Sequence, residues 1–292
     1  MNKAVQLRGL LEKPGLLLLP GVYDALSAKL AVSAGFSAIY LSGSAIAMGQ
    51  FGYPDVGLPT MTEVMEQLRR VTAAVDVPVV VDIDTGYGNA VNVLRTIREA
   101  EAAGAAAVQM EDQVFPKKCG HFEGKEVIPL EEMVGKIKAA VAARQKDLVI
   151  IGRTDARAVI GLEEAIRRGR AFAEAGADVI FVEAPRSREE MLQITQAIPA
   201  PLLVNMVEGG KTPQLSLAEL QEVGYKIALY PTACIRAVSQ TLIKLYGHLL
   251  AHGSTADILD QLVSFEERNR ITGLAWYEEW ASKFGGDKEA NN

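Results

Sequence analysis

Cysteine and histidine are scarce in this chain of 292 residues, which contains two of the former and three of the latter. Two cysteines far apart, Cys119 and Cys234, cannot form the disulfide framework of a small secreted protein, so the sequence favours a reducing compartment, the cytoplasm. Zinc is not expected either, because no second Cys/His pair has the spacing of a ligand set. Cys234, in the apolar segment PTACIRAV, is expected to be a small buried hydrophobe.

Long apolar runs and blocks of like charge are also missing. No run approaches the roughly 18 apolar residues that a membrane span needs, and the start MNKAVQLRGLLEKPG is too polar for a signal peptide. The formal net charge of −6 is spread along the chain, which argues against nucleic acid or an anionic membrane as the partner. With 49% hydrophobic and 23% charged residues, we expect a globular protein with a large core.

Short apolar runs alternate with amphipathic helical stretches along the whole sequence. The runs cover residues 16–21, 37–43, 77–84, 105–112, 147–155, 178–184, 201–206 and 226–231. Apolar strands followed by helices predict a parallel sheet that is buried on both faces, and eight such units fit one (β/α)8 barrel. We expect a single domain over residues 1–284 and a frayed tail over 285–292. A doubly wound open sheet is the alternative, although no GxGxxG follows the first strand.

Polar residues gather where these apolar strands end, which is where barrels of this type place their chemistry. Asp82 and Asp84 in VVVDIDTGYGN are two apart, so on a strand they would point to the same side. Two close carboxylates suit a hard cation, Mg²⁺ or Mn²⁺, and Glu111 on the next strand end could add a ligand. The other interpretation is that one aspartate caps a turn and the other pairs with an arginine.

Arg153 lies near the end of the fifth run, where its guanidinium could hold a substrate carboxylate with two parallel hydrogen bonds. It could instead form an internal ion pair with Asp155 or Glu183. Further polar candidates at this rim are Ser42, Gly43, Ser44, Asn205 and Arg236.

The segment FPKKCGHFEG lies in a connection, residues 113–129, that is long for a strand-to-helix loop. Loops of this length in compact domains are usually lids or binding elements. Cys119 stands there beside Lys117, Lys118 and His121, and nearby positive charge would lower the pKa of its thiol. The sequence therefore predicts a reactive cysteine on a mobile loop.

The motifs YLSGS, VDIDTGYGN, VQMEDQ, KKCGH, GRTDA, VEA and LVNM occur in this order at the eight-strand spacing. In this combination the chain resembles the isocitrate lyase/phosphoenolpyruvate mutase superfamily, and within it the 2-methylisocitrate lyase-like branch, over essentially its whole length. The resemblance implies a (β/α)8 barrel whose last helix is exchanged between the subunits of a homotetramer. Trp276, Trp280 and Phe284 recur every four residues near that end.

The resemblance also implies the site. Mg²⁺ would be bound by Asp82 and Asp84, with Glu111 reaching it through water. KKCGH would be a mobile gate that carries the general acid, Cys119. The catalytic residues would be Cys119, His121, Glu111 and Arg153, and the residues around the substrate would be Tyr40, Ser42, Gly43, Ser44, Asp55, Gly120, Glu183, Asn205 and Arg236.

The implied activity is cleavage of a carbon–carbon bond in a small 2-hydroxy carboxylate, either 2-methylisocitrate or 2,3-dimethylmalate, to give pyruvate. Related lyases tend to read NITEFG where this chain reads NMVEGG, so Val207 replaces a hydroxyl that could contact the third carboxylate of a tricarboxylate. The alternatives are an oxaloacetate decarboxylase or hydrolase, a phosphonate-processing mutase, and a barrel that binds a metabolite without turnover.

Overall fold

The computed structural model describes residues 2–120, 123–145 and 147–285. Its chain divides into two compact units, one up to Ala237 and one from Val238 onward. The single domain expected over residues 1–284 stays a prediction, and residues 286–292 of the expected tail lie outside the described residues.

The strands of the first unit form a closed parallel barrel in the order β1 to β8. Each strand lies within one of the eight predicted runs, except that β1 extends one residue beyond the first run, to Val22. The strands are β1 Leu17–Val22, β2 Ile39–Leu41, β3 Val79–Asp82, β4 Ala107–Glu111, β5 Val149–Thr154, β6 Val179–Val182, β7 Leu202–Asn205 and β8 Ile227–Tyr230. The barrel prediction is confirmed, and the open doubly wound sheet is wrong because β8 pairs with β1.

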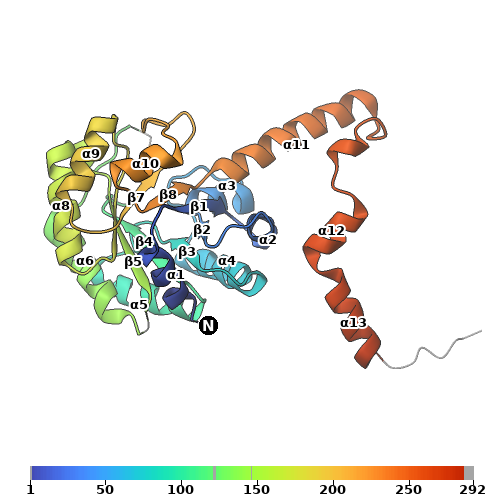
Figure 1. Ribbon diagram of the computed structural model, residues 1–292, viewed down its shortest axis with the longest axis horizontal. Coiled ribbons are helices and arrows are strands. Elements are labelled where there is room, and N and C mark those ends of the chain that lie inside the picture. Colours follow the sequence, from blue (N-terminus) through green and yellow to red (C-terminus); the bar gives the residue numbers. More distant parts are fainter. Residues whose placement is uncertain (1, 121–122, 146, 286–292) are drawn as a thin grey trace, which may run out of the picture. The chain divides into compact units, whose positions relative to one another are not determined.

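Helices cover the outside of the barrel (Figure 1). Those of the first unit are α1 Lys3–Glu12, α2 Ala25–Ser33, α3 Gly43–Phe51, α4 Met61–Ala74, α5 Ala90–Ala102, α6 Leu130–Ala143, α7 Ala156–Val159, α8 Leu162–Glu174, α9 Arg188–Ala197 and α10 Leu217–Val223. Helix α5 is representative: Asn89 caps its first turn, and Val93, Ile97 and Ala100 form the buried face. It ends before Gly104, whose positive φ of 90° favours glycine.

Alternation along the strands separates two cores. One set of side chains, including Val80, Val149 and Leu203, packs inside the barrel. The neighbouring residues, such as Val81 and Ile150, pack between the sheet and the helices. Successive side chains of a strand point to opposite faces. The side chains that face the barrel interior therefore continue, toward the carboxyl ends of the strands, into the polar residues found there.

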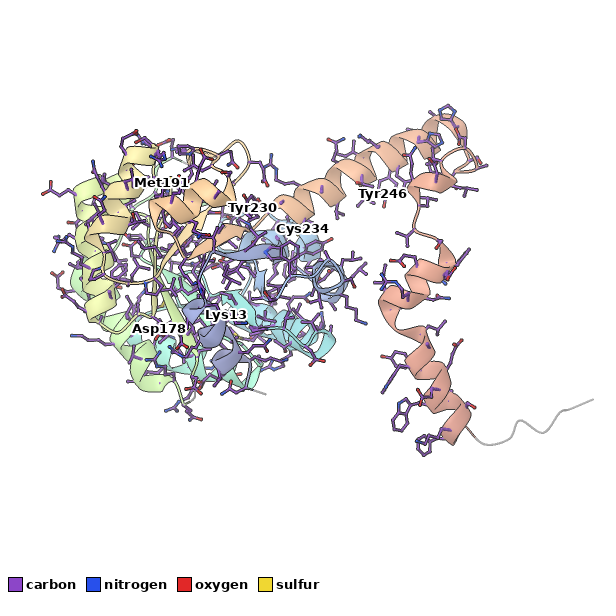
Figure 2. All side chains as sticks on the ribbon, in the orientation of Figure 1. Lys13, Asp178, Met191, Tyr230, Cys234 and Tyr246 are labelled. Carbon is purple, nitrogen blue, oxygen red and sulfur yellow. The ribbon has the colours of Figure 1, made fainter. Side chains whose placement is uncertain are left out.

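The amino-terminal end of the barrel is held by charge pairs around Asp178, which is labelled in Figure 2. Arg8 of α1 lies 3.0 Å from Asp178 Oδ1, and Arg144 lies 2.7 Å from Oδ2. Asp178 Oδ2 also accepts the backbone N–H of Ile150. These contacts join α1 to β5 and to the turn before β6, away from the polar rim.

The second unit contains most of α11 Ala233–His252, then η1 Leu259–Gln261, α12 Phe265–Thr272 and α13 Leu274–Phe284. On α13 the ring centroids of Trp276 and Trp280 are 5.7 Å apart, and those of Trp280 and Phe284 are 5.0 Å apart. The predicted aromatic stripe is therefore present on one face of this helix. Among the described residues, no helix has the length and apolarity required to cross a membrane.

Candidate active site

The inward-facing positions at the carboxyl ends of the strands surround a cavity of about 80 Å³. Its walls come from the seven strands β2 to β8 or the residues just after them, from α3 and the segment that follows it, and from the long loop after β4. The lining residues are Tyr40, Ser42, Ser44, Asp55, Asp82, Gln109, Lys117, Cys119, Gly120, Arg153, Phe181, Glu183, Asn205, Val207, Leu229, Pro231 and Thr232. Most of the substrate and catalytic residues predicted from the sequence are in this list.

Asp82 and Asp84 converge beside the first turn of α3. A Cβ placed on Gly43 would lie 3.1 Å from Asp82 Oδ2 and 3.4 Å from Asp84 Oδ1, so the two carboxylates approach one point. The pleat of a strand is not the reason, because β3 ends at Asp82 and Asp84 has a left-handed φ of 46°. Asp82 accepts the backbone N–H groups of Gly43 and Asp84, which brings the turn back toward α3. Such a backbone conformation is uncommon outside glycine and is found mostly where a site requires it.

These two carboxylates fit a hard cation. Lys117 pairs with Asp55, and its Nζ lies 3.1 Å from Asp84 Oδ1. One positive charge therefore already lies beside the two converging carboxylates. Burial raises the pKa of Asp84 to about 6, Lys117 opposes this rise, and the charge of Asp82 adds to it. Over the part of the chain that the structure describes, no group of three or more His, Cys, Asp or Glu side chains is placed to hold a metal ion, so Glu111 does not join Asp82 and Asp84 in a direct ligand set. Mg²⁺ is commonly bound through one or two carboxylates together with water and substrate oxygens, which suits this donor set.

Glu111 and Asp112 point to opposite sides of β4. Glu111 faces the barrel interior, where its Oε2 lies 3.1 Å from Arg153 Nη1. Burial, partly offset by the charge of Arg153, raises the pKa of Glu111 well above its usual value. Asp112 faces the helix layer and pairs with Arg168 of α8. Of these two carboxylates, Glu111 is therefore the one on the side of the cavity.

Arg153 is enclosed by three carboxylates. Its Nε and Nη2 donate to Asp155 at 2.9 and 3.2 Å, and Nη2 also lies 3.1 Å from Glu183 Oε2. Both internal ion pairs considered from the sequence, with Asp155 and with Glu183, are therefore present, and the contact to Glu111 is a third. Arg153 nevertheless lines the cavity. It therefore joins three carboxylates and also brings a positive charge to the cavity wall.

Several buried polar atoms near the cavity lack partners. Among the described residues, Gln109 Nε2, Glu111 Oε1 and Asn205 Oδ1 make no hydrogen bond. Tyr40 donates its hydroxyl to Gln109 Oε1, and Asn205 Nδ2 donates to Glu183, which leaves the opposite end of each amide open. Buried polar groups are rarely left unpaired, so this pattern is typical of a site that binds a polar ligand.

The loop after β4 brings Cys119 to the cavity. Gln113 holds the loop, because its side chain accepts from the backbone N–H of Lys118 and donates to the Lys118 carbonyl, both at 2.9 Å. Cys119 is half-buried and lines the cavity together with Gly120. A Cβ on Gly120 would lie 2.6 Å from Arg153 Nη2, so the loop backbone lies directly against the Arg153 guanidinium.

The other predicted residues fall into three groups. Ser42 caps α3, while Ser44 and Asp55 line the cavity. Arg236 is exposed and pairs with Glu208, and it does not contribute to the described cavity wall. His121 lies outside the described residues.

Sequence reasoning missed Gln109 and the buried Lys125, and treated Lys117 only as a positive neighbour of the thiol. Gln109 could have been found, because it is two residues before Glu111 on the same face of β4. No local pattern identifies Lys125 or the Lys117–Asp55 pair, since both depend on how the loop folds back over the barrel.

Comparisons with known proteins agree with this geometry. The phosphoenolpyruvate phosphomutase family model matches residues 7–250. The chain is 49% identical over 275 residues to the 2,3-dimethylmalate lyase of Eubacterium barkeri, covering 94% of this chain and 95% of that one. It is 47% identical over 272 residues to the 2-methylisocitrate lyase of Aeropyrum pernix, covering 93% and 88%.

Solved structures are also similar to this chain over nearly its whole length. A crystal structure of 2,3-dimethylmalate lyase, described as a PEP mutase/isocitrate lyase superfamily member, has a TM-score of 0.93 and 37% identity, covering 100% of this chain and 98% of that one. A phosphonopyruvate hydrolase in complex with oxalate and Mg²⁺ has a TM-score of 0.87 and 33% identity, covering 97% and 99%.

The fold and the site define an α/β-barrel enzyme with an acidic, arginine-containing site at its carboxyl-terminal rim. The chain belongs to the phosphoenolpyruvate phosphomutase family, in the 2-methylisocitrate lyase-like branch of the isocitrate lyase/phosphoenolpyruvate mutase superfamily. The resemblance stated from its motifs is thereby confirmed. Its class is that of a carbon–carbon lyase.

Proposed function

We propose that this protein is a Mg²⁺-dependent lyase that splits a 2-hydroxy carboxylate into pyruvate and a second carboxylate. The candidate substrates are 2,3-dimethylmalate, which would give propionate, and 2-methylisocitrate, which would give succinate. One observation carries the proposal: Asp82, Cys119 and Arg153 line a single cavity, and Asp84 converges with Asp82 at its edge.

Asp82 and Asp84, with Glu111 further out, are the residues that would hold Mg²⁺ or Mn²⁺, which supplies the positive charge that makes the substrate hydroxyl easier to ionise. Ser44 and the amino terminus of α3 offer donors to the keto-acid half of the substrate. Arg153 and the open amide of Gln109 offer positive charge and a donor to the second carboxylate.

Cleavage follows from these placements. Once the C2 hydroxyl has lost its proton, its electrons form the C2 carbonyl of pyruvate and the C2–C3 bond breaks. The electron pair of that bond moves to C3 and is delocalised into the adjacent carboxylate as an enediolate. Cys119 then gives its proton to C3, which completes the second product. The small cavity excludes bulk water, which would otherwise compete as the proton donor.

One observation favours the dicarboxylate. Val207, an apolar side chain, lines the cavity where a third carboxylate would need a donor. We therefore place 2,3-dimethylmalate before 2-methylisocitrate.

The test is pyruvate release from 2,3-dimethylmalate, 2-methylisocitrate, oxaloacetate and phosphonopyruvate, each with Mg²⁺ and with EDTA. The expected result is the highest kcat/KM with dimethylmalate and loss of activity in EDTA. Turnover of oxaloacetate or phosphonopyruvate alone, or no turnover of any of the four, would contradict the proposal.

A homotetramer with exchanged carboxyl-terminal helices is part of the same proposal. Trp276, Trp280 and Phe284 on α13 are 57%, 43% and 66% exposed in the single chain. An apolar stripe of this kind usually meets another surface, and here the proposed partner is a second copy of the chain. Light scattering of the full chain should give four times the monomer mass, and a monomer at micromolar concentration would refute the assembly.

A further inference from the structure

The long loop after β4 is closed at its base by backbone pairing. Gln113 forms an antiparallel bridge with Val127, and the backbone N–H of Val114 donates to Glu126 at 2.9 Å. The backbone N–H of Ile128 donates to the Asp112 carbonyl at the end of β4. We call residues 115–120 and 123–126 the flap. Beyond this base, Cys119 is held by the two hydrogen bonds between Gln113 and Lys118, by the ion pairs of Lys117 and by the contacts of Lys125.

Among the described residues, Lys125 makes the most deeply buried ion pair between the flap and the barrel wall. Its Nζ lies 2.9 Å from Asp155 Oδ1, and the exposed fractions of the two side chains are 1% and 0%. The same Nζ donates to the carbonyl of Gly120 across the flap. One ammonium group therefore joins the residue next to Cys119 to the residue that follows β5.

Asp155 contacts both Lys125 and the proposed substrate arginine, Arg153. Its two carboxylate oxygens accept from Arg153 Nε and Nη2 while Oδ1 also pairs with Lys125. The Gly120 backbone lies beside Nη2 of the same guanidinium. The position of the thiol and the position of the arginine are thus set by one buried charge network.

We propose that Lys125 is a positioning residue that holds the flap closed and so keeps Cys119 in the cavity. This inference rests on the proposed role of Cys119 as the acid. It adds that closure depends on a lysine outside the KKCGH segment, which no part of the proposed chemistry requires. A cavity this small admits a substrate only when the flap moves away, so the buried pair must break and form again in each turnover.

The test compares Lys125→Met with Lys211→Met in the full chain. Lys211 pairs with Glu123 on the same flap, but that glutamate side chain is 86% exposed, so the pair should contribute little. The alkylation rate of Cys119 by iodoacetamide is followed by mass spectrometry of its peptide. We expect Lys125→Met to raise this rate about tenfold or more, because removing one partner of a buried ion pair leaves the other uncompensated. Lys211→Met should stay within about twofold of the wild-type rate.

Steady-state kinetics and hydrogen exchange separate positioning from general stability. With dimethylmalate, Lys125→Met should lower kcat more than it changes KM, and exchange should rise in residues 113–128 but not in the barrel strands. Equal alkylation rates in the two variants, or exchange raised throughout the barrel, would overturn the inference. Faster alkylation in a chain that cleaves none of the four substrates would support the flap contact and refute only the proposed function.

Discussion

Arg168 Nη1 lies 2.9 Å from Asp112 Oδ2, in the layer between β4 and α8. The same nitrogen donates to the carbonyl of Ile128, where the loop after β4 ends, and Asp112 accepts from Thr154 at the end of β5. This pair therefore joins two strand ends, one helix and the base of the flap.

Replacing Arg168 by methionine should lower the free energy of unfolding by about 3–5 kcal/mol, because Asp112 would be left buried without its partner. Arg167 is the matched control: it pairs with the same Glu164 as Arg168, but its side chain is 58% exposed. Arg167→Met should leave the free energy of unfolding nearly unchanged. Urea denaturation measures both values, and equal losses would show that the buried pair has no special contribution.

Cys119→Ser should keep metal and ligand binding but lose turnover. A serine hydroxyl is a much weaker acid than a thiol, so we expect kcat to fall by about 10²–10⁴-fold. Calorimetric titration with oxalate and Mg²⁺ checks that binding remains. Full activity in this variant would rule out the thiol as the proton donor.

Asp84→Asn should weaken divalent cation binding by at least about a hundredfold, because it removes one of two converging charges. Binding of Mn²⁺, followed by its electron paramagnetic resonance signal, reports on this without any turnover. Asp76→Asn is the control, since that side chain is fully exposed. Unchanged Mn²⁺ affinity in Asp84→Asn would remove the metal assignment.

Val207→Thr should shift preference toward the tricarboxylate. The added hydroxyl offers a donor to a third carboxylate, and we expect the ratio of kcat/KM for 2-methylisocitrate over dimethylmalate to rise by about tenfold or more. Val207→Ala, which shortens the side chain without adding a donor, separates polarity from space. The same shift in both variants would mean that size alone decides.

Cys234 should react slowly with alkylating reagents below pH 9. Burial raises the pKa of its thiol to about 11 from an ordinary value of 9.0, and a raised pKa means less thiolate at any given pH. Its alkylation rate should therefore continue to increase up to about pH 11. A plateau near pH 9, measured on the Cys234 peptide, would contradict this effect of burial. Cys234 is labelled in Figure 2, at the start of α11.

The eight strands and their helices could be predicted because each depends on local pattern. Apolar runs of strand length and helical periodicity are properties of neighbouring residues, and the strand ends of a parallel barrel necessarily meet at one rim. Asp82, Arg153, Glu183 and Asn205 could therefore be assigned to one site from their positions alone. Cys119 could be assigned to the same site because the KKCGH motif of the loop resembles that of the family.

What the tertiary structure decided are the pairings between residues far apart in the chain. Asp84 reaches Asp82 through a left-handed turn beside α3, which no strand alternation predicts. Glu111 and Asp112 separate into the barrel interior and the helix layer. Lys125 finds Asp155 only after the loop has folded over the barrel. The physical reason is that the sequence specifies periodicity and charge locally, whereas the partner of a buried charge is fixed by packing.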